Sequence, residues 1–209
     1  MVSLTLRTLL GCLFLCTGLL RGQRAQARPT SLVDSLRTMR VVPLADGPNH
    51  VDLNGDGKPD LVWRAWRDNG NAHGFDVLTF YVSNPTPEYY DGRPWLLVPL
   101  YDSTHALEQD FYRTFQGADC VLEDVFLIRS KSDSQAPALL VRATRDFGET
   151  FGDTMPVTFV VYRLVTDSMG LGSPYSFRAI RTIHSRRRFC DVGEAFEKEL
   201  GLVYSRSAK

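Results

Sequence analysis

The chain has 209 residues, and its 24 lysines and arginines balance its 24 aspartates and glutamates, so the formal net charge is zero at pH 7. This length suits one domain of ordinary size with a real hydrophobic core. The balanced charge gives no support for nucleic-acid binding, which is typical of domains with a clear excess of basic residues.

The N-terminal segment has the pattern of a secretory signal peptide. Arg7 supplies the positive start, Leu9–Leu20 is an apolar run, and AQA ends at Ala27 as a cleavage site of small residues. A membrane anchor is the alternative, but a spanning helix needs about 20 apolar residues. We therefore expect cleavage before Arg28, no stable membrane anchor afterwards, and a periplasmic or secreted protein. Cleavage removes three arginines and no acid, so the basic count falls from 24 to 21 against 24 acids, giving a net charge of −3.

After this segment, short β-type runs alternate with polar turn sequences. A short helix is expected within 30–40, and the spacing of Leu107, Phe111 and Phe115 predicts another at 103–115. A terminal helix is predicted at 191–200. Strands are predicted at 40–45, 60–68, 74–83, 93–101, 121–130, 138–147, 155–165 and 176–185.

The connections between these strands indicate antiparallel pairing. A loop rich in glycine and asparagine joins 60–68 to 74–83, which is typical of a hairpin. The last four strands are joined by short polar loops, which favours an antiparallel meander. We therefore expect residues 28–209 to form a single, mainly β domain, a sandwich or meander with one or two short helices.

Two cysteines remain after signal cleavage, Cys120 and Cys190. In an oxidising compartment a lone pair of cysteines predicts a disulfide. It would close a loop of roughly 70 residues and contribute about 4 kcal/mol in the chain-entropy model. Two separate buried thiols are the alternative.

The sequence DLNGDGKPD, residues 52–60, has the spacing of a calcium-binding loop. Ca²⁺ prefers oxygen ligands, and here they would be the side chains of Asp52, Asn54, Asp56 and Asp60 with the backbone carbonyl of Lys58. The loop resembles those of FG-GAP and VCBS repeats, but it occurs once, which excludes a propeller. The alternative is a metal-free loop of Asx turns.

The search for catalytic motifs is negative. The chain lacks G-x-S-x-G, H-E-x-x-H and S-x-x-K, which favours a protein without enzymatic activity. The loop between residues 67 and 76 is instead rich in polar and charged side chains that could bind a ligand, namely Arg67, Asn69, Asn71, His73 and Asp76. We interpret these residues as a candidate binding site for a small polar molecule, with a simple polar hairpin tip as the alternative.

Residues 52–81, with their calcium-type loop and NAHGFD hairpin, resemble the carbapenem intrinsic-resistance proteins CarG and CpmJ. The resemblance implies an exported bacterial protein with a β-rich fold, self-association as a homodimer, and binding of a β-lactam instead of its hydrolysis. Two alternatives stay open, a secreted hydrolase on a calcium-stabilised scaffold and an exported structural β-domain.

Overall fold

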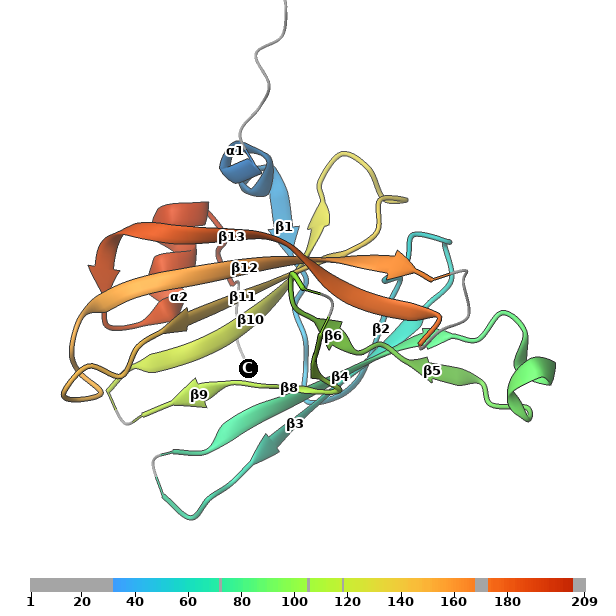
Figure 1. The fold of residues 1–209 in the computed structure, drawn as a ribbon, viewed down its shortest axis with the longest axis horizontal. Helices are drawn as coiled ribbons and strands as arrows, with labels where there is room; N and C mark the ends of the chain where they lie inside the picture. The colour runs from blue at the N-terminus through green and yellow to red at the C-terminus, as the bar shows by residue number, and fades with distance from the viewer. Residues whose placement is uncertain (1–31, 72, 105, 118, 168–172, 205–209) are drawn as a thin grey trace, which may run out of the picture.

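The computed structural model describes residues 32–71, 73–104, 106–117, 119–167 and 173–204. The predicted signal peptide, residues 1–27, lies outside them. The described chain forms two β-sheets that pack face to face, and a C-terminal helical segment covers the far side of the larger sheet (Figure 1). This confirms the predicted fold class, which is mainly β, largely antiparallel and not a propeller.

The larger sheet has eight strands in the order β1-β10-β11-β12-β13-β6-β7, with β9 also paired to β10. Its centre is the predicted antiparallel meander, which is confirmed. The meander strands are β10 (Val121–Ser130), β11 (Leu139–Arg145), β12 (Met155–Thr166) and β13 (Tyr175–Phe189). The short strands are β1 (Met39–Val41), β6 (Leu100–Tyr101), β7 (Leu107–Gln109) and β9 (Phe115–Gln116).

The smaller sheet has five strands in the order β2-β3-β4-β5, with β8 also paired to β4. Its core is the predicted hairpin, in which Arg67 of β3 pairs with Phe75 of β4. The strands are β2 (Gly47–Val51), β3 (Asp60–Arg67), β4 (Phe75–Ser83), β5 (Trp95–Leu97) and β8 (Tyr112–Arg113). A 3₁₀ turn, η1 (Pro87–Tyr90), lies between β4 and β5.

Residues 93–101 were predicted to form one strand, but the chain crosses here from one sheet to the other. The Val98 N–H donates to the carbonyl of Phe80 in the smaller sheet, whereas the Pro99 carbonyl accepts from Phe177 in the larger one. Proline lacks a donor and interrupts the ladder at this point. The segment therefore divides into β5 and β6, and links the two layers.

The helix predicted at 103–115 is wrong, because this segment contains the short strands β7, β8 and β9. The side chains that suggested helical spacing, Leu107, Phe111 and Phe115, are 55%, 47% and 38% exposed. The buried side chains are Tyr112 and Thr114, which are two residues apart as a strand requires.

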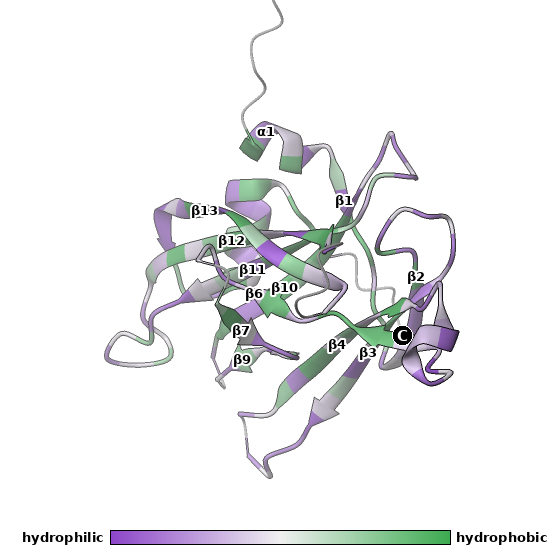
Figure 2. Cartoon of the chain, turned by 45° about the vertical axis from the view of Figure 1, so that its right-hand side comes forward, coloured by the Kyte–Doolittle hydropathy of each residue, from purple (hydrophilic) through white to green (hydrophobic). Residues whose placement is uncertain are grey.

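The predicted terminal helix is confirmed as α2 (Val192–Ala195) followed by a π-helical turn, η2 (Phe196–Leu200). With α1 (Leu32–Arg37), the expected N-terminal helix, it packs on the far side of the larger sheet. One core therefore lies between the two sheets and a second lies under the helices. In Figure 2 hydrophobic residues colour β4 and β10 green, whereas the outlying loops are mostly purple. No helix in the described ranges is long and apolar enough to cross a membrane.

The predicted disulfide is present between Cys120 and Cys190, with their Cα atoms 5.7 Å apart. It joins the start of β10 to the end of β13. The next residue, Asp191, accepts hydrogen bonds from the Gly193 N–H at 2.6 Å and the Val121 N–H at 3.1 Å. Its carboxylate therefore caps α2 and also holds the helix against β10.

Candidate ligand site

The predicted calcium loop is a tight series of Asx turns between β2 and β3. The carboxylate of Asp52 accepts from the N–H groups of Gly55 at 2.7 Å and Gly57 at 3.1 Å. Both glycines have positive φ, at 81° and 83°, which side chains rarely allow. The Asp56 carboxylate accepts from the Lys58 N–H at 2.8 Å. These contacts direct the carboxylates of Asp52 and Asp56 towards backbone N–H groups of the loop itself.

Asp60 is the last residue of the loop and the first of β3, and its side chain is fully buried. One carboxylate oxygen accepts from the Ser83 N–H and the other from the Leu53 N–H, each at 2.8 Å. Burial raises the pKa of Asp60 although these hydrogen bonds favour its charged form. The residue therefore ties the loop to the neighbouring strand β4.

The donor set of this loop suits Ca²⁺, but the side chains as placed do not form a closed site. Among the described residues, no group of three or more histidine, cysteine, aspartate or glutamate side chains is placed to share a metal ion. Arg129 lies 3.5 Å from Asp52 and supplies positive charge at the loop. Both oxygens of Asp60 already accept backbone N–H groups, so a cation would have to share them or rearrange the loop.

The structure separates the residues of the predicted hairpin site. The Asn69 side chain donates to the His73 carbonyl at 2.7 Å, and the His73 N–H donates to the Asn71 side chain at 2.8 Å. The His73 ring lies against Phe151, with centroids 4.9 Å apart. Arg67 lies over the Phe75 ring. These four side chains close the hairpin tip and occupy its rim, so they do not converge on a pocket with Asp76.

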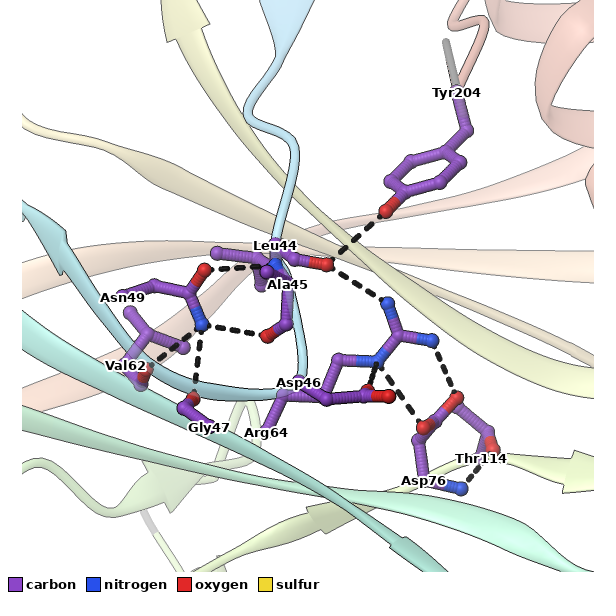
Figure 3. A network of polar contacts seen from close by, with 10 residues as sticks. All are labelled: Leu44, Ala45, Asp46, Gly47, Asn49, Val62, Arg64, Asp76, Thr114 and Tyr204. Atoms are coloured by element: carbon purple, nitrogen blue, oxygen red, sulfur yellow. Dashed lines mark hydrogen bonds and ion pairs between the residues drawn. The ribbon is translucent and has the colours of Figure 1, made fainter. Parts of the chain in front are cut away.

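Asp76 lies on the opposite face of the hairpin from Phe75, facing the larger sheet. It receives a bidentate ion pair from Arg64, with Nε at 3.1 Å and Nη2 at 2.8 Å (Figure 3). Arg64 also donates to the Leu44 carbonyl at 3.0 Å, and this oxygen accepts from the Tyr204 hydroxyl at 3.2 Å. The ion pair raises the pKa of Arg64 and fixes its guanidinium.

This network forms one wall of a cavity between the two sheets, the interlayer cavity, with a volume of about 420 Å³. Such a volume is in the range of small-molecule sites. Its apolar lining comes mainly from β10, residues 41–44 and the chain after η2. Its polar lining includes Arg64, Asp76, Thr114, Asp124, Asp191 and Tyr204. Apolar walls with a few convergent polar groups are the arrangement expected of a recognition site.

Asp124 is the most unusual of these residues. It lies within β10, between the buried Leu122 and Val125, and its own side chain lines the cavity. Burial is the main reason that its pKa rises to about 7; Asp76 and Asp191 add to the rise, and Arg64 opposes it. Its carboxyl accepts one hydrogen bond, from the adjacent Val125 N–H at 2.7 Å. The carboxyl is therefore poised to change charge near neutral pH.

Sequence reasoning found Asp76 and missed the other polar residues of the cavity. One signal was available, because an aspartate within the apolar run VLEDVFLI is costly to bury and needs a reason. The remaining residues come from β3, the segment before β9, and the C-terminal segment, which only the tertiary structure brings together.

Comparison with known proteins places the chain in a family. Residues 44–198 match the family described as carbapenem resistance protein CarG-like. A crystal structure of CarG matches with a TM-score of 0.61 and 25% sequence identity, covering 78% of this chain and 98% of CarG. A search of curated proteins gave no match. The family match spans most of the chain and includes the smaller sheet, most of the larger sheet and most of the residues that line the interlayer cavity, so this protein belongs to the CarG-like family of carbapenem resistance proteins.

Proposed function

We propose that this protein protects against β-lactam antibiotics by binding them without hydrolysis, and that the interlayer cavity is the binding site. The observation that carries the proposal is the cavity itself, about 420 Å³ in volume, with Arg64 and Thr114 on its wall. A carbapenem has a compact bicyclic ring and a carboxylate. Apolar walls suit the ring, and an arginine with a neighbouring hydroxyl suits the carboxylate.

Arg64 keeps donors for such a ligand. A guanidinium has about five N–H groups. The described hydrogen bonds of Arg64 use one N–H on each of Nε, Nη2 and Nη1, and Asp46 lies 3.7 Å from Nε, so these contacts with described residues leave one N–H on each Nη atom for a ligand. The Thr114 hydroxyl accepts from the Asp76 N–H at 2.9 Å, so its own O–H remains available to donate. Because the ion pair with Asp76 fixes Arg64, little side-chain entropy would be lost on binding.

The chemistry of the lining favours binding over turnover. β-Lactam hydrolysis needs an activated nucleophile or a metal-bound water. Among the residues that the structure describes, those lining the cavity include no serine, cysteine, histidine or lysine. One observation favours the alternative hydrolase, namely Asp124, whose pKa of about 7 is suitable for a general base that activates water.

A matched pair of variants tests the proposal. Arg64 and Arg67 lie on the same strand, but only Arg64 lines the cavity. Calorimetry should show that wild type binds a carbapenem. Arg64→Gln should raise the dissociation constant about tenfold or more, because the variant loses a charged hydrogen bond to the ligand. Arg67→Gln should bind like wild type. Melting curves check that each variant folds, and Arg64→Lys tests whether charge alone suffices.

The outcomes separate the candidate sites and functions. Loss of binding only in Arg67→Gln would assign the ligand to the hairpin predicted from sequence. Ring opening, followed by absorbance with the protein in catalytic amounts, would favour the hydrolase. Absence of both heat and turnover would leave the exported structural β-domain.

We also propose that the loop at residues 52–60 binds calcium and that the protein is exported. The support for calcium is the donor chemistry, with carboxylates, an amide oxygen and a backbone carbonyl within one loop. A disulfide and a signal-type N-terminal segment are what an exported protein would carry. Self-association stays a prediction, which sedimentation of the purified protein tests.

A further inference from the structure

The interlayer cavity has an excess of negative charge. Within the described part of the chain, its lining includes the acids Asp76, Asp124, Asp191 and Glu197 and a single basic residue, Arg64. Asp76 already neutralises that arginine through the bidentate contact. A ligand that carries only a carboxylate would therefore enter a field that opposes it, whereas a cationic group would be attracted.

The four acids differ in how many carboxylate oxygens remain without a hydrogen-bond partner among the described residues. Both oxygens of Asp76 contact Arg64, and both oxygens of Asp191 accept backbone N–H groups. Glu197 lies at the exposed edge beside Lys198. Within the described ranges, the carboxyl of Asp124 accepts a single hydrogen bond, from its neighbour Val125. Asp124 therefore has an oxygen available to a ligand in the cavity.

We propose that the cavity selects ligands that carry a protonated amine or amidine, with Asp124 as the residue that binds this cation. The inference rests on the proposed function and narrows it to a zwitterionic carbapenem, whose ring carboxylate meets Arg64 and Thr114 while its basic side chain meets Asp124. This arrangement resolves the charge conflict, because the ligand then brings one charge of each sign to complementary groups.

Ionisation of Asp124 makes the selection depend on pH. Its charged and titratable neighbours are Arg64 and Asp76 from the smaller sheet, Asp191 before α2, and Tyr112 of β8. Burial holds the carboxyl partly neutral near pH 7. Affinity for a cationic ligand should therefore rise as the carboxyl ionises, and a bound cation should in turn lower the pKa of Asp124.

Calorimetry with a matched ligand pair tests the inference. The pair shares the carbapenem ring and carboxylate, but one member carries an amidine side chain and the other a neutral one of similar size. Wild type should bind the amidine compound more tightly, and more so at about pH 8 than at about pH 6. Asp124→Asn should weaken only the amidine compound, about tenfold to a hundredfold, and remove its pH dependence.

Glu123→Gln is the matched control, because Glu123 lies on the same strand outside the cavity and pairs with the Tyr112 hydroxyl. It should bind both compounds like wild type. Equal binding of both compounds by wild type, or full affinity of Asp124→Asn for the amidine compound, would overturn the inference and leave the proposed function intact. Binding of neither compound would overturn both. Melting curves confirm that each variant is folded.

Discussion

Replacing Asp124 by asparagine should make the protein more stable above neutral pH and leave its stability almost unchanged in acid. Burial raises the pKa of this carboxyl from 3.8 to about 7. Each pKa unit corresponds to about 1.4 kcal/mol, so the shift of about three units corresponds to at most about 4 kcal/mol. Because the side chain is only partly buried, solvent screening reduces this value, and we expect about 2–4 kcal/mol.

The direction of the pH dependence follows from the pH range in which the native state, but not the unfolded chain, holds the proton. Between about pH 4 and about pH 7 the native state keeps a proton on Asp124 that the unfolded chain releases. The stabilising contribution is therefore complete below about pH 4 and is lost as the pH rises through about 7. Asparagine has nearly the same shape as the protonated acid, and its Oδ1 can still accept from the Val125 N–H.

Urea unfolding of wild type and Asp124→Asn across this pH range measures the effect. The difference between the two proteins cancels other buried acids such as Asp60 and Glu123, whose pKa values burial also raises. We expect the two free energies of unfolding to converge as the pH falls below about 4, and the variant to become progressively more stable than wild type between about pH 4 and about pH 7, with the full difference present at about pH 8. A difference that stays constant with pH would show that Asp124 is solvated like a surface carboxylate, and would refute the reasoning.

Three further predictions follow from the loop, the disulfide and the N-terminal segment. Asp56→Ala should abolish any rise in melting temperature with calcium, and a wild-type melting temperature that a chelator leaves unchanged would mean that the loop is only a turn. Replacing Cys120 and Cys190 by serine should lower the free energy of unfolding by about 4 kcal/mol, measured by urea titration; an unchanged midpoint would show that the crosslink constrains little. N-terminal sequencing of exported protein should begin at Arg28, and material that retains Leu9–Leu20 would contradict cleavage.

Local patterns predicted the paired strands well. The hairpin at β3 and β4 follows from strand alternation on both sides of a polar loop, and the meander follows from four β-runs with short connections. The disulfide followed from the two cysteines that remain after signal cleavage and the oxidising compartment expected of an exported protein. For the hairpin and the meander, neighbours in sequence are neighbours in space, so the signal lies within one short stretch of chain. The disulfide joins residues 70 apart and could be predicted because only one pairing is possible for two cysteines.

The same approach failed at residues 103–115 because tertiary packing decided the outcome. Leu107, Phe111 and Phe115 have helical spacing, and all three are exposed in the structure. Tyr112 is buried because β8 pairs with β4 and its hydroxyl meets Glu123 of the opposite sheet. Burial of Tyr112 depends on partners distant in sequence, which a periodicity cannot reveal.

The candidate site shows the same division between local and distant information. Residues 67–76 are rich in polar side chains, but most of them serve the hairpin itself, as the contacts of Asn69 and His73 show. Asp76 differs because strand alternation turns it towards the larger sheet, where it meets Arg64 and the cavity. A polar residue next to a turn usually forms hydrogen bonds within that turn. A charged residue inside an apolar strand needs a partner from another part of the structure or a ligand, because burying an unpaired charge is costly. By this criterion Asp124, within the β10 apolar run, was a stronger indication of a ligand site than the hairpin tip.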